Sequence, residues 1–333
     1  MRPFPWALSG GLWLILAAPA LAEVVITVAK DGAAQFTTVQ AAIDAIPAGG
    51  TVPHVVQIAP GRYEERVTIP KDKPFVTLRG QDPGTTVITY KLGANAPGAD
   101  GRPIGTSKTA TVYFLAHDCA AENVAFQNSF GEGAQAVAVH TKGDRLTFRN
   151  CRFLGWQDTV YADGGRQYYK DCHIEGHCDF IFGNATAFFQ ECTIRCLSAN
   201  YITAQSRTAA DQTTGYVFQN CRIVTVDPGQ GIYLGRPWRP FARVVYLDCW
   251  LDAGVRPEGW HNWSDPSREA TVFYAEYRST GPGANPAARV SWSRQLTDRQ
   301  AEEFSVKKFL SGSDGWAPWT QTTTEPATPP AAD

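Results

Sequence analysis

A short phrase of polar, small, polar and apolar residues recurs through the middle of the chain. It reads Asn-Cys-Arg-Phe at 150–153, Asp-Cys-His-Ile at 171–174, Glu-Cys-Thr-Ile at 191–194, Asn-Cys-Arg-Ile at 220–223 and Asp-Cys-Trp-Leu at 248–251. An earlier copy at 123–126, Asn-Val-Ala-Phe, has valine in the cysteine position, and successive copies are 27, 21, 20, 29 and 28 residues apart. Alternation of this kind predicts one β-strand in each repeat, with the cysteines pointing inward.

Repeats of this length, each with one strand, predict a solenoid. Leucine-rich repeats are the first rival, but their leucine pattern is absent and few helical periods lie between the phrases. Stacked β-coils fit better, so we expect an all-β, single-stranded parallel β-helix with C-terminal loops. Residues 31–47 form the exception, because their apolar positions follow a helical period. They predict a short amphipathic helix that caps the N-terminal end.

The N-terminus resembles a secretory signal peptide. Arg2 precedes an apolar stretch at residues 12–18, and Ala-Leu-Ala at 20–22 offers a cleavage site. A membrane anchor is the alternative, but the stretch is short for a bilayer span and follows a Ser-Gly-Gly break at 9–11. We expect residues 1–22 to be removed after Ala22 and the protein to be secreted or periplasmic. The domain is expected at 23–317, followed by a disordered Pro/Thr/Ala-rich tail at 318–333.

Composition and charge narrow the class of protein. The 333 residues carry a formal net charge of −2, whereas a nucleic-acid-binding protein needs a basic face. An aromatic content of 12% argues against disorder of the whole chain. No second apolar run approaches the length of a membrane span, so no membrane contact is expected. Nothing marks an oligomer interface, and a monomer is the default expectation.

Two carboxylates share one position in the repeat. Asp158 and Asp179 each lie seven residues after a repeat cysteine. If the coils stack in register, the two lie about 5 Å apart on adjacent coils. Two carboxylates this close cannot both ionise freely, which supplies an acid beside an anionic base or nucleophile. The alternative is a pair of solvated aspartates at surface turns, and the spacing alone does not decide between the two.

The neighbouring residues favour a catalytic pair. Gln157 directly precedes the first carboxylate, and a neutral amide there can donate hydrogen bonds to a developing oxyanion. Arg236, within Leu-Gly-Arg-Pro-Trp at 234–238, could hold one carboxylate bidentately and keep it ionised.

At this point the chain resembles the pectin methylesterases (pectinesterases), carbohydrate esterases with a right-handed parallel β-helix, and we expect a secreted bacterial member. The resemblance covers nearly the whole chain after residue 22. It rests on segments in matching order, namely Gly-Arg-Tyr-Glu-Glu at 61–65, Gln-Ala-Val-Ala-Val at 135–139, Gln-Asp-Thr at 157–159, Asp-Phe-Ile-Phe-Gly at 179–183, Leu-Gly-Arg-Pro-Trp at 234–238 and Tyr-Ala-Glu-Tyr at 274–277.

The resemblance implies a role for each matching residue. Asp179 is expected to be the nucleophile that attacks a galacturonate C6 methyl ester, with Asp158 as the general acid and then the general base. Gln157 and Gln135 are expected to stabilise the oxyanion, and Arg236 to orient Asp179. Trp238, Tyr161 and Phe182 are expected to stack against sugar rings of methyl-esterified pectin. The resemblance implies no metal and no cofactor.

Cys178 stands where the family has an aliphatic residue. Strand alternation predicts that its thiol points away from the face that presents Asp179, into the core. Disulfides are permitted in an exported protein. The pairs Cys172–Cys192 and Cys178–Cys196 are therefore both open, as is an unbonded stack of thiols.

Two other classes of function stay open at this point. A β-helix glycoside hydrolase or lyase would act on the same polymer, and a related ester or thioester hydrolase would use the same fold. A carboxylate pair about 5 Å apart also suits glycoside cleavage, but the polygalacturonase signatures and an acidic calcium cluster are absent. A non-catalytic homologue should lack one of Asp158, Asp179, Gln157 or Arg236, and all four are present.

Overall fold

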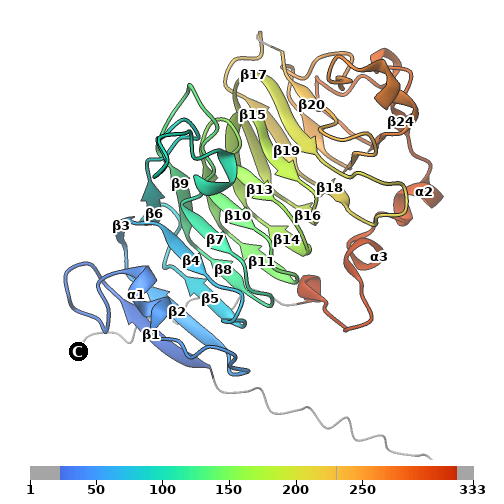
Figure 1. Cartoon of the computed structure of the whole chain (residues 1–333). Coiled ribbons are helices and arrows are strands. Elements are labelled where there is room, and N and C mark those ends of the chain that lie inside the picture. Colours follow the sequence, from blue (N-terminus) through green and yellow to red (C-terminus); the bar gives the residue numbers. More distant parts are fainter. Residues whose placement is uncertain (1–22, 230, 321–333) are drawn as a thin grey trace, which may run out of the picture.

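A computed structural model of the protein describes residues 23–229 and 231–320. The strands stack into coils that progress along one axis from the N-terminal to the C-terminal end (Figure 1). Every strand pair is parallel, and each strand pairs with its counterpart in the next coil. This is the parallel β-helix that the repeats predict. The predicted leader at 1–22 lies outside the described residues.

Each coil contributes strands to three faces. The first face consists of β1 (Val24–Val28), β2 (His54–Ile58), β5 (Val76–Arg79), β8 (Ala120–Glu122), β11 (Leu146–Arg149), β14 (Arg166–Lys170), β16 (Thr186–Gln190), β18 (Gly215–Gln219), β21 (Arg243–Leu247), β23 (Phe273–Tyr277) and β24 (Arg294–Gln295).

The second face follows directly after it along the chain. It consists of β3 (Gly61–Glu64), β6 (Thr86–Tyr90), β9 (Ala125–Asn128), β12 (Arg152–Leu154), the first halves of β15 (His173–Gly183) and β17 (Thr193–Gln205), β19 (Arg222–Thr225) and β22 (Trp250–Leu251).

The third face carries the cleft described below. It consists of β4 (Val67–Ile69), β7 (Val112–Phe114), β10 (Val139–Thr141), β13 (Val160–Ala162), the second halves of β15 and β17, and β20 (Tyr233–Gly235).

The repeated phrase lies at the corner between the first two faces. Its first, polar residue adopts a left-handed backbone in every copy, with φ between 47° and 57° (Asn123, Asn150, Asp171, Glu191, Asn220 and Asp248). Asparagine and aspartate tolerate this conformation better than other non-glycine residues, which explains their recurrence. The strand begins only after the small residue, so the phrase is a corner followed by a strand.

The small residues of the phrase form an inward ladder, as predicted. Each cysteine is buried and its thiol donates to a backbone carbonyl of the preceding coil, for example Cys172 to Phe148 at 3.5 Å and Cys192 to Tyr169 at 3.6 Å. All eight cysteines are free thiols, so neither pair that the sequence left open is bonded.

A column of aromatic rings lies beside this ladder. Phe148, Tyr169, Phe189, Phe218 and Tyr246 stack in successive coils with ring centroids 4.8, 4.5, 4.5 and 4.6 Å apart. In-register stacking of parallel coils brings equivalent rings to about one strand spacing, which suits offset stacking.

The N-terminal helix is shorter than predicted. α1 comprises Val39–Asp44, capped by the Thr38 side chain, and buries Val39, Ala42 and Ile43 against β1, β2 and β4. The residues from 31 to 38 do not join it, because Phe36 pairs with Val28 as a strand extension. Within the described residues, no helix is long and apolar enough to cross a membrane.

The C-terminal segment returns along the first face. α2 (Asp298–Glu302) and α3 (Val306–Leu310) lead to residues that pack on the outer side chains of this face, including Tyr168, Phe188 and Val217. Pro318 is buried in a short 3₁₀ turn, Pro318–Thr320. The first three residues assigned to the tail, 318–320, therefore form a turn, and the rest of the predicted tail lies outside the described residues.

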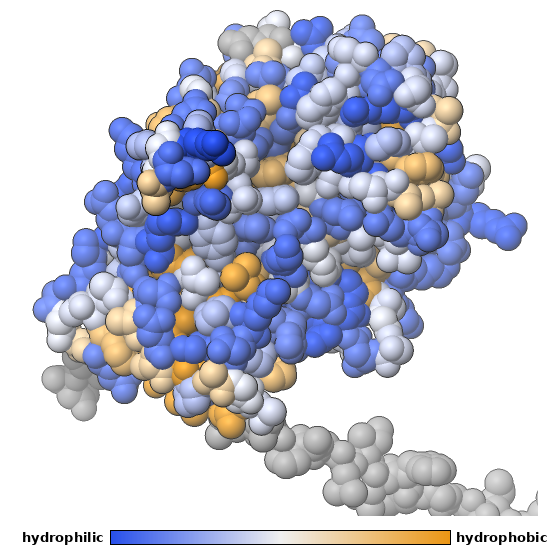
Figure 2. All heavy atoms as spheres, viewed as in Figure 1, coloured by the Kyte–Doolittle hydropathy of each residue, from blue (hydrophilic) through white to orange (hydrophobic). Residues whose placement is uncertain are grey.

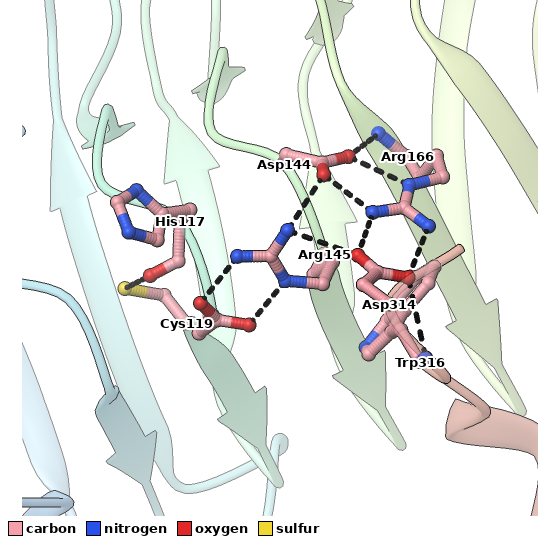
Figure 3. Close-up of polar contacts among 8 residues, drawn as sticks. His117, Cys119, Asp144, Arg145, Arg166, Asp314 and Trp316 are labelled. Atoms are coloured by element: carbon pink, nitrogen blue, oxygen red, sulfur yellow. Dashed lines mark hydrogen bonds and ion pairs between the residues drawn. The ribbon is translucent and has the colours of Figure 1, made fainter. Parts of the chain in front are cut away.

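An ion-pair network fastens this segment (Figure 3). Asp314 accepts hydrogen bonds from Arg145 at 3.1 Å and from Arg166 at 2.9 Å, and both arginines also bind Asp144. Arg145 in turn bridges to Asp118 at 2.7 Å. The network joins three turns of the solenoid to the returning chain, because Asp118 precedes β8, Arg145 precedes β11 and Arg166 begins β14.

The visible surface is mainly hydrophilic, and hydrophobic residues reach it in small clusters (Figure 2). The large hydrophobic residues that are exposed are few, and three of the four, Val24, Val25 and Val52, belong to the N-terminal edge. Isolated residues of this kind are normal for a soluble surface.

Candidate active site

The eight residues predicted for the site converge on one cleft. Its volume is about 530 Å³. The lining comprises the predicted Gln135, Gln157, Asp158, Tyr161, Asp179, Phe182, Arg236 and Trp238, together with Thr106, Ser107, Ala204 and Trp263. The structure therefore brings together side chains that are separated by up to about a hundred residues along the chain.

The backbone places the two carboxylates side by side. Gln157 pairs with Cys178 in a parallel bridge, and the N–H of Asp158 donates to the Cys178 carbonyl at 3.1 Å. Asp158 therefore lies next to Asp179 in the following coil, which confirms the register predicted from the repeat. Both residues have left-handed φ values, 67° and 49°. Asp158 lies just before β13 and Asp179 lies within β15, and both line the cleft.

Arg236 holds one carboxylate and not the other. Its Nε and Nη2 donate to Oδ1 and Oδ2 of Asp179 at 2.9 and 2.6 Å, a bidentate pair. The guanidinium lies between two rings, 3.9 Å from the centroid of Tyr201 and 3.7 Å from that of Trp263. Rings on both sides restrict its rotation, so the ion pair keeps one orientation.

Burial and charge separate the two aspartates. Asp158 is 8% exposed and Asp179 is 6% exposed. Burial, and then the nearby Asp179 charge, raise the pKa of Asp158 well above its ordinary value. Burial also raises the pKa of Asp179, but the hydrogen bonds and charge of Arg236 oppose that rise. The shared proton therefore resides on Asp158 while Asp179 stays anionic.

The side-chain amides of Gln135 and Gln157 also line the cleft. The side chains of Gln135 and Gln157 have no hydrogen-bond partner within the described part of the chain, so their N–H groups are free to donate to a bound group. The N–H of Ala136 donates to the Gln157 carbonyl at 3.1 Å, which fixes the two glutamine segments on adjacent coils.

Tyr161 and Phe182 line the cleft, and both faces of the Tyr161 ring are covered. The Tyr161 ring lies between His140, at 4.3 Å, and Phe182, at 4.4 Å, and all three rings are nearly parallel. Phe182 also meets Trp238 at 6.0 Å in a tilted arrangement. The expected stacking of a sugar on the face of Tyr161 does not fit this geometry, while stacking on Phe182 stays a prediction.

Cys178 corrects a prediction from the sequence. Its thiol does not point into the core but lies in the site, half-buried and 3.7 Å from Arg236 Nη2. Alternation fails here because the left-handed Asp179 and irregular pairing in β15 place residues 178 and 179 on the same side.

Some lining residues had no strong signal in the sequence. Thr106 and Ser107 belong to a 3₁₀ turn, Thr106–Lys108, in a long loop outside the repeats. Trp263 was one of several tryptophans, and only its contact with Arg236 separates it from the fully buried Trp260. No group of three or more metal-ligating side chains that could hold an ion occurs among residues 23–229 and 231–320.

The sequence pattern of the pectinesterase family matches residues 25–313. The chain belongs to the pectinesterase family. It is similar to Pectinesterase 31 of Arabidopsis thaliana, with 44% identity over 299 residues that cover 88% of this chain and 94% of that protein. As a member of this family, the protein is a carboxylic ester hydrolase.

Solved structures of pectinesterases share the fold. The pectin methylesterase from carrot superposes with a TM-score of 0.82 at 32% identity, covering 88% of this chain and 95% of that one. The Erwinia chrysanthemi enzyme PemA gives 0.76 at 29% identity, covering 89% and 98%. A pectin methylesterase mutant in complex with a hexasaccharide gives 0.75 at 28% identity, covering 90% and 98%. The right-handed parallel β-helix is confirmed, while similar proteins from plants, fungi and bacteria leave the expected bacterial source a prediction.

Proposed function

We propose that this pectinesterase hydrolyses the C6 methyl esters of galacturonate units in pectin, releasing methanol through an acyl-enzyme on Asp179. The observation that carries the proposal is the bidentate bond from Arg236 to Asp179, beside an Asp158 that has no such partner. One carboxylate is thereby anionic and the other protonated in the same cleft, as nucleophilic catalysis with a general acid requires.

The first half of the reaction forms the acyl-enzyme. An oxygen of Asp179 attacks the ester carbonyl, and the resulting oxyanion accepts hydrogen bonds from the amides of Gln135 and Gln157. The tetrahedral intermediate collapses as the C–OCH₃ bond breaks, and Asp158 gives its proton to the departing methoxide oxygen. Methanol leaves, and a mixed anhydride joins Asp179 to the galacturonate.

The second half regenerates the enzyme. Asp158 is now an anion and takes a proton from water, and the hydroxide attacks the acyl carbonyl. The bond to Asp179 breaks, galacturonate leaves as a free carboxylic acid that ionises in solvent, and Asp158 holds the proton again. Arg236 stabilises the Asp179 carboxylate as the leaving group.

Trp238 is the ring best placed to contact a sugar. Its indole lines the cleft, and Arg239 lies over the ring with 4.7 Å between its guanidinium carbon and the ring centroid. Phe182 contacts this indole, with 6.0 Å between the ring centroids, and Tyr161 stacks on Phe182. The substrate is therefore methyl-esterified homogalacturonan bound along the third face.

Three further properties belong to the same proposal. Residues 1–22 act as a secretion signal, cleavage follows Ala22, and the mature protein works as a monomer outside the cytoplasm or in a periplasm. Sequencing of the N-terminus of the secreted protein tests the first two, since it should begin at Glu23. Size-exclusion chromatography tests the third.

Methanol release from highly methylated pectin, run beside a reducing-sugar assay, tests the reaction. We expect methanol without new reducing ends from the wild type, and a loss of about 10⁴-fold or more for Asp179→Asn, which keeps the shape and removes the nucleophile. Asp171→Asn at an exposed corner is the matched control and should keep full activity. Reducing ends without methanol would assign the chain to glycoside cleavage instead.

A further inference from the structure

Cys178 contacts the charged groups of the site from two directions. Its Sγ lies 3.7 Å from Nη2 of Arg236, the same nitrogen that donates to Asp179 Oδ2 at 2.6 Å. Its backbone carbonyl accepts the N–H of Asp158 at 3.1 Å. Among the eight cysteines, all of which are described, the other seven are buried and Cys178 alone is half-exposed.

The backbone explains why the thiol lies beside Arg236. In a regular strand, residues 178 and 179 would face opposite sides. The pairing of β15 with β17 is irregular on both sides of Cys178, which pairs with Tyr201, and Asp179 has a φ of 49°. Phe180 then returns to the core, where it is fully buried. The thiol and the carboxylate therefore share one side.

We propose that Cys178 is a positioning residue for the esterase reaction, whose S–H donates to the Asp179 carboxylate while its sulfur accepts from Arg236. The triangle of thiol, guanidinium and carboxylate holds Asp179 in one rotamer and supports its anionic form. This role rests on the proposed function, because it acts through the nucleophile assigned there.

The thiol keeps its proton under the conditions in which it would act. Burial, and then the adjacent Asp179 charge, raise the pKa of Cys178 to about 12. A thiol of this kind is a hydrogen-bond donor at neutral pH and a poor nucleophile, since only the thiolate attacks. Cys178 therefore assists Asp179 and does not replace it.

The thiol and Arg236 shift the pKa of Asp179 in the same direction. Burial raises the pKa of Asp179, and the Arg236 pair and the Cys178 hydrogen bond both lower it. The other titratable groups that face this point come from neighbouring elements. They are Asp158 before β13, His177 in β15, Tyr201 in β17, His261 in the loop after β22, and Tyr274 in β23.

Two substitutions distinguish the loss of the hydrogen-bond donor from a change in side-chain volume. Cys178→Val removes the donor at similar size, and Cys178→Ser keeps an O–H donor. The measurement is the pH profile of kcat/KM for methanol release from methylated pectin. We expect the acid limb of Cys178→Val to move up by about half a pH unit, so that kcat falls about twofold at the midpoint of the wild-type limb and about threefold well below it, with KM unchanged. The Cys178→Ser profile should stay at the wild-type position.

Cys196→Val is the matched control, because Cys196 is a buried cysteine on the next coil with no contact to Arg236 or Asp179. It should leave the pH profile unchanged. If Cys178→Val does not fold, Cys178→Ala removes the same donor and carries the test.

A Cys178→Val profile that superimposes on the wild type would overturn the positioning role, as would equal shifts for valine and serine. Either result leaves the proposed function intact, provided that the wild type releases methanol. A wild type that releases no methanol from any methylated galacturonan overturns the proposed function and this role together.

Discussion

Asp158 and Asp179 are chemically identical residues that their surroundings make different. Arg236 donates two hydrogen bonds to Asp179, whereas no described side chain donates to Asp158. Both carboxylates are buried, so the unpaired one bears the full cost of desolvation and the paired one does not. In the proposed mechanism, the difference between the acid and the nucleophile therefore comes from a single guanidinium and from the rings that hold it.

An unpaired buried carboxylate also affects stability in a way that depends on pH. The pKa of Asp158 is raised in the folded state. The stability that this shift contributes is fully present below the pKa of the unfolded chain, about 3.9, and is lost as pH rises through the pKa of the folded protein. Asp158→Asn never ionises. We expect this inactive variant to match the wild type in melting temperature near pH 3.5 and to exceed it by a few degrees at pH 8. Calorimetry at both values checks this, and an equal difference at both would contradict it.

The adjacency of the two aspartates could be predicted because they repeat with the coil. Two aspartates at one offset from a repeat cysteine indicate adjacency without any knowledge of loops, and the bridge from Gln157 to Cys178 confirms it. The position of Cys178 could not be predicted, since the left-handed Asp179 and the irregular pairing of β15 with β17 interrupt the alternation, and a strand pattern reports neither of them. The stacking of Tyr161 against Phe182 could not be predicted for a related reason. A strand pattern indicates which side of the sheet a ring faces, but it does not indicate which neighbouring ring covers it.

At the scale of elements, the site depends on how closely β17 and β20 approach. Gly235 pairs with Thr203, and the N–H of Arg236 donates to the Thr203 carbonyl at 2.9 Å. A Cβ on Gly235 would lie 2.0 Å from the Thr203 hydroxyl oxygen and 3.2 Å from its carbonyl oxygen. The absence of a side chain at 235 thus fixes the position from which Arg236 reaches Asp179.

Gly235→Ala should therefore impair catalysis more than its size suggests. Separation of β20 from β17 by a few tenths of an ångström moves the guanidinium, and small misplacements of catalytic groups are costly. We expect kcat/KM to fall about 10- to 100-fold, with a lower melting temperature. Gly61→Ala is the control, because a Cβ there finds only ordinary contacts of 3.4 Å or more. If Gly235→Ala had wild-type kinetics, β17 and β20 would be able to move apart without loss of activity, and the prediction would be wrong.

The same reasoning explains which elements were predictable. The corners and strands of the solenoid recur in every coil, so one sequence phrase predicts many coils. The polar residue of the phrase occupies the corner because aspartate and asparagine tolerate positive φ. Helix α1 was predicted too long because helical periodicity continues into residues 31–38, where pairing of Phe36 with Val28 is the stronger interaction. Sheet pairing is decided by neighbours far along the chain, and a local period does not report it.

At the scale of the whole molecule, the C-terminal segment closes a face that the solenoid leaves apolar. Tyr168, Phe188 and Val217 point outward from the first face and are buried by residues that follow β24. This explains why β16 and β18 are buried on both sides rather than alternating. No repeat marks the returning segment, so its course could not be predicted from the sequence.

Asp314 should make the attachment of this segment sensitive to salt. The pKa of Asp314 is lowered by its hydrogen bonds with Arg166, so its ion pairs persist through the neutral range and are lost only in strong acid. Ion pairs at a surface weaken as salt screens them. We expect Asp314→Ala to lower the melting temperature at low ionic strength and to match the wild type more closely in 1 M NaCl. Hydrogen exchange should rise in β11 and β14, the strands beside the network, while methanol release stays unchanged.

The exposed pair of Asp298 with Arg278 provides the control. Its atoms are 3.2 Å apart, but its side chains are 79% and 64% exposed, and Asp298 also accepts a hydrogen bond from the Tyr277 hydroxyl at 3.0 Å. Exposed pairs of this kind contribute little to stability, so Asp298→Ala should leave both the melting temperature and its salt dependence near the wild type. If the two variants behaved alike, the Arg145–Arg166–Asp314 network would be no stronger than an isolated surface pair. The hydrophobic contacts of Trp316 and Trp319 would then account for the attachment, because those contacts do not weaken when salt is added.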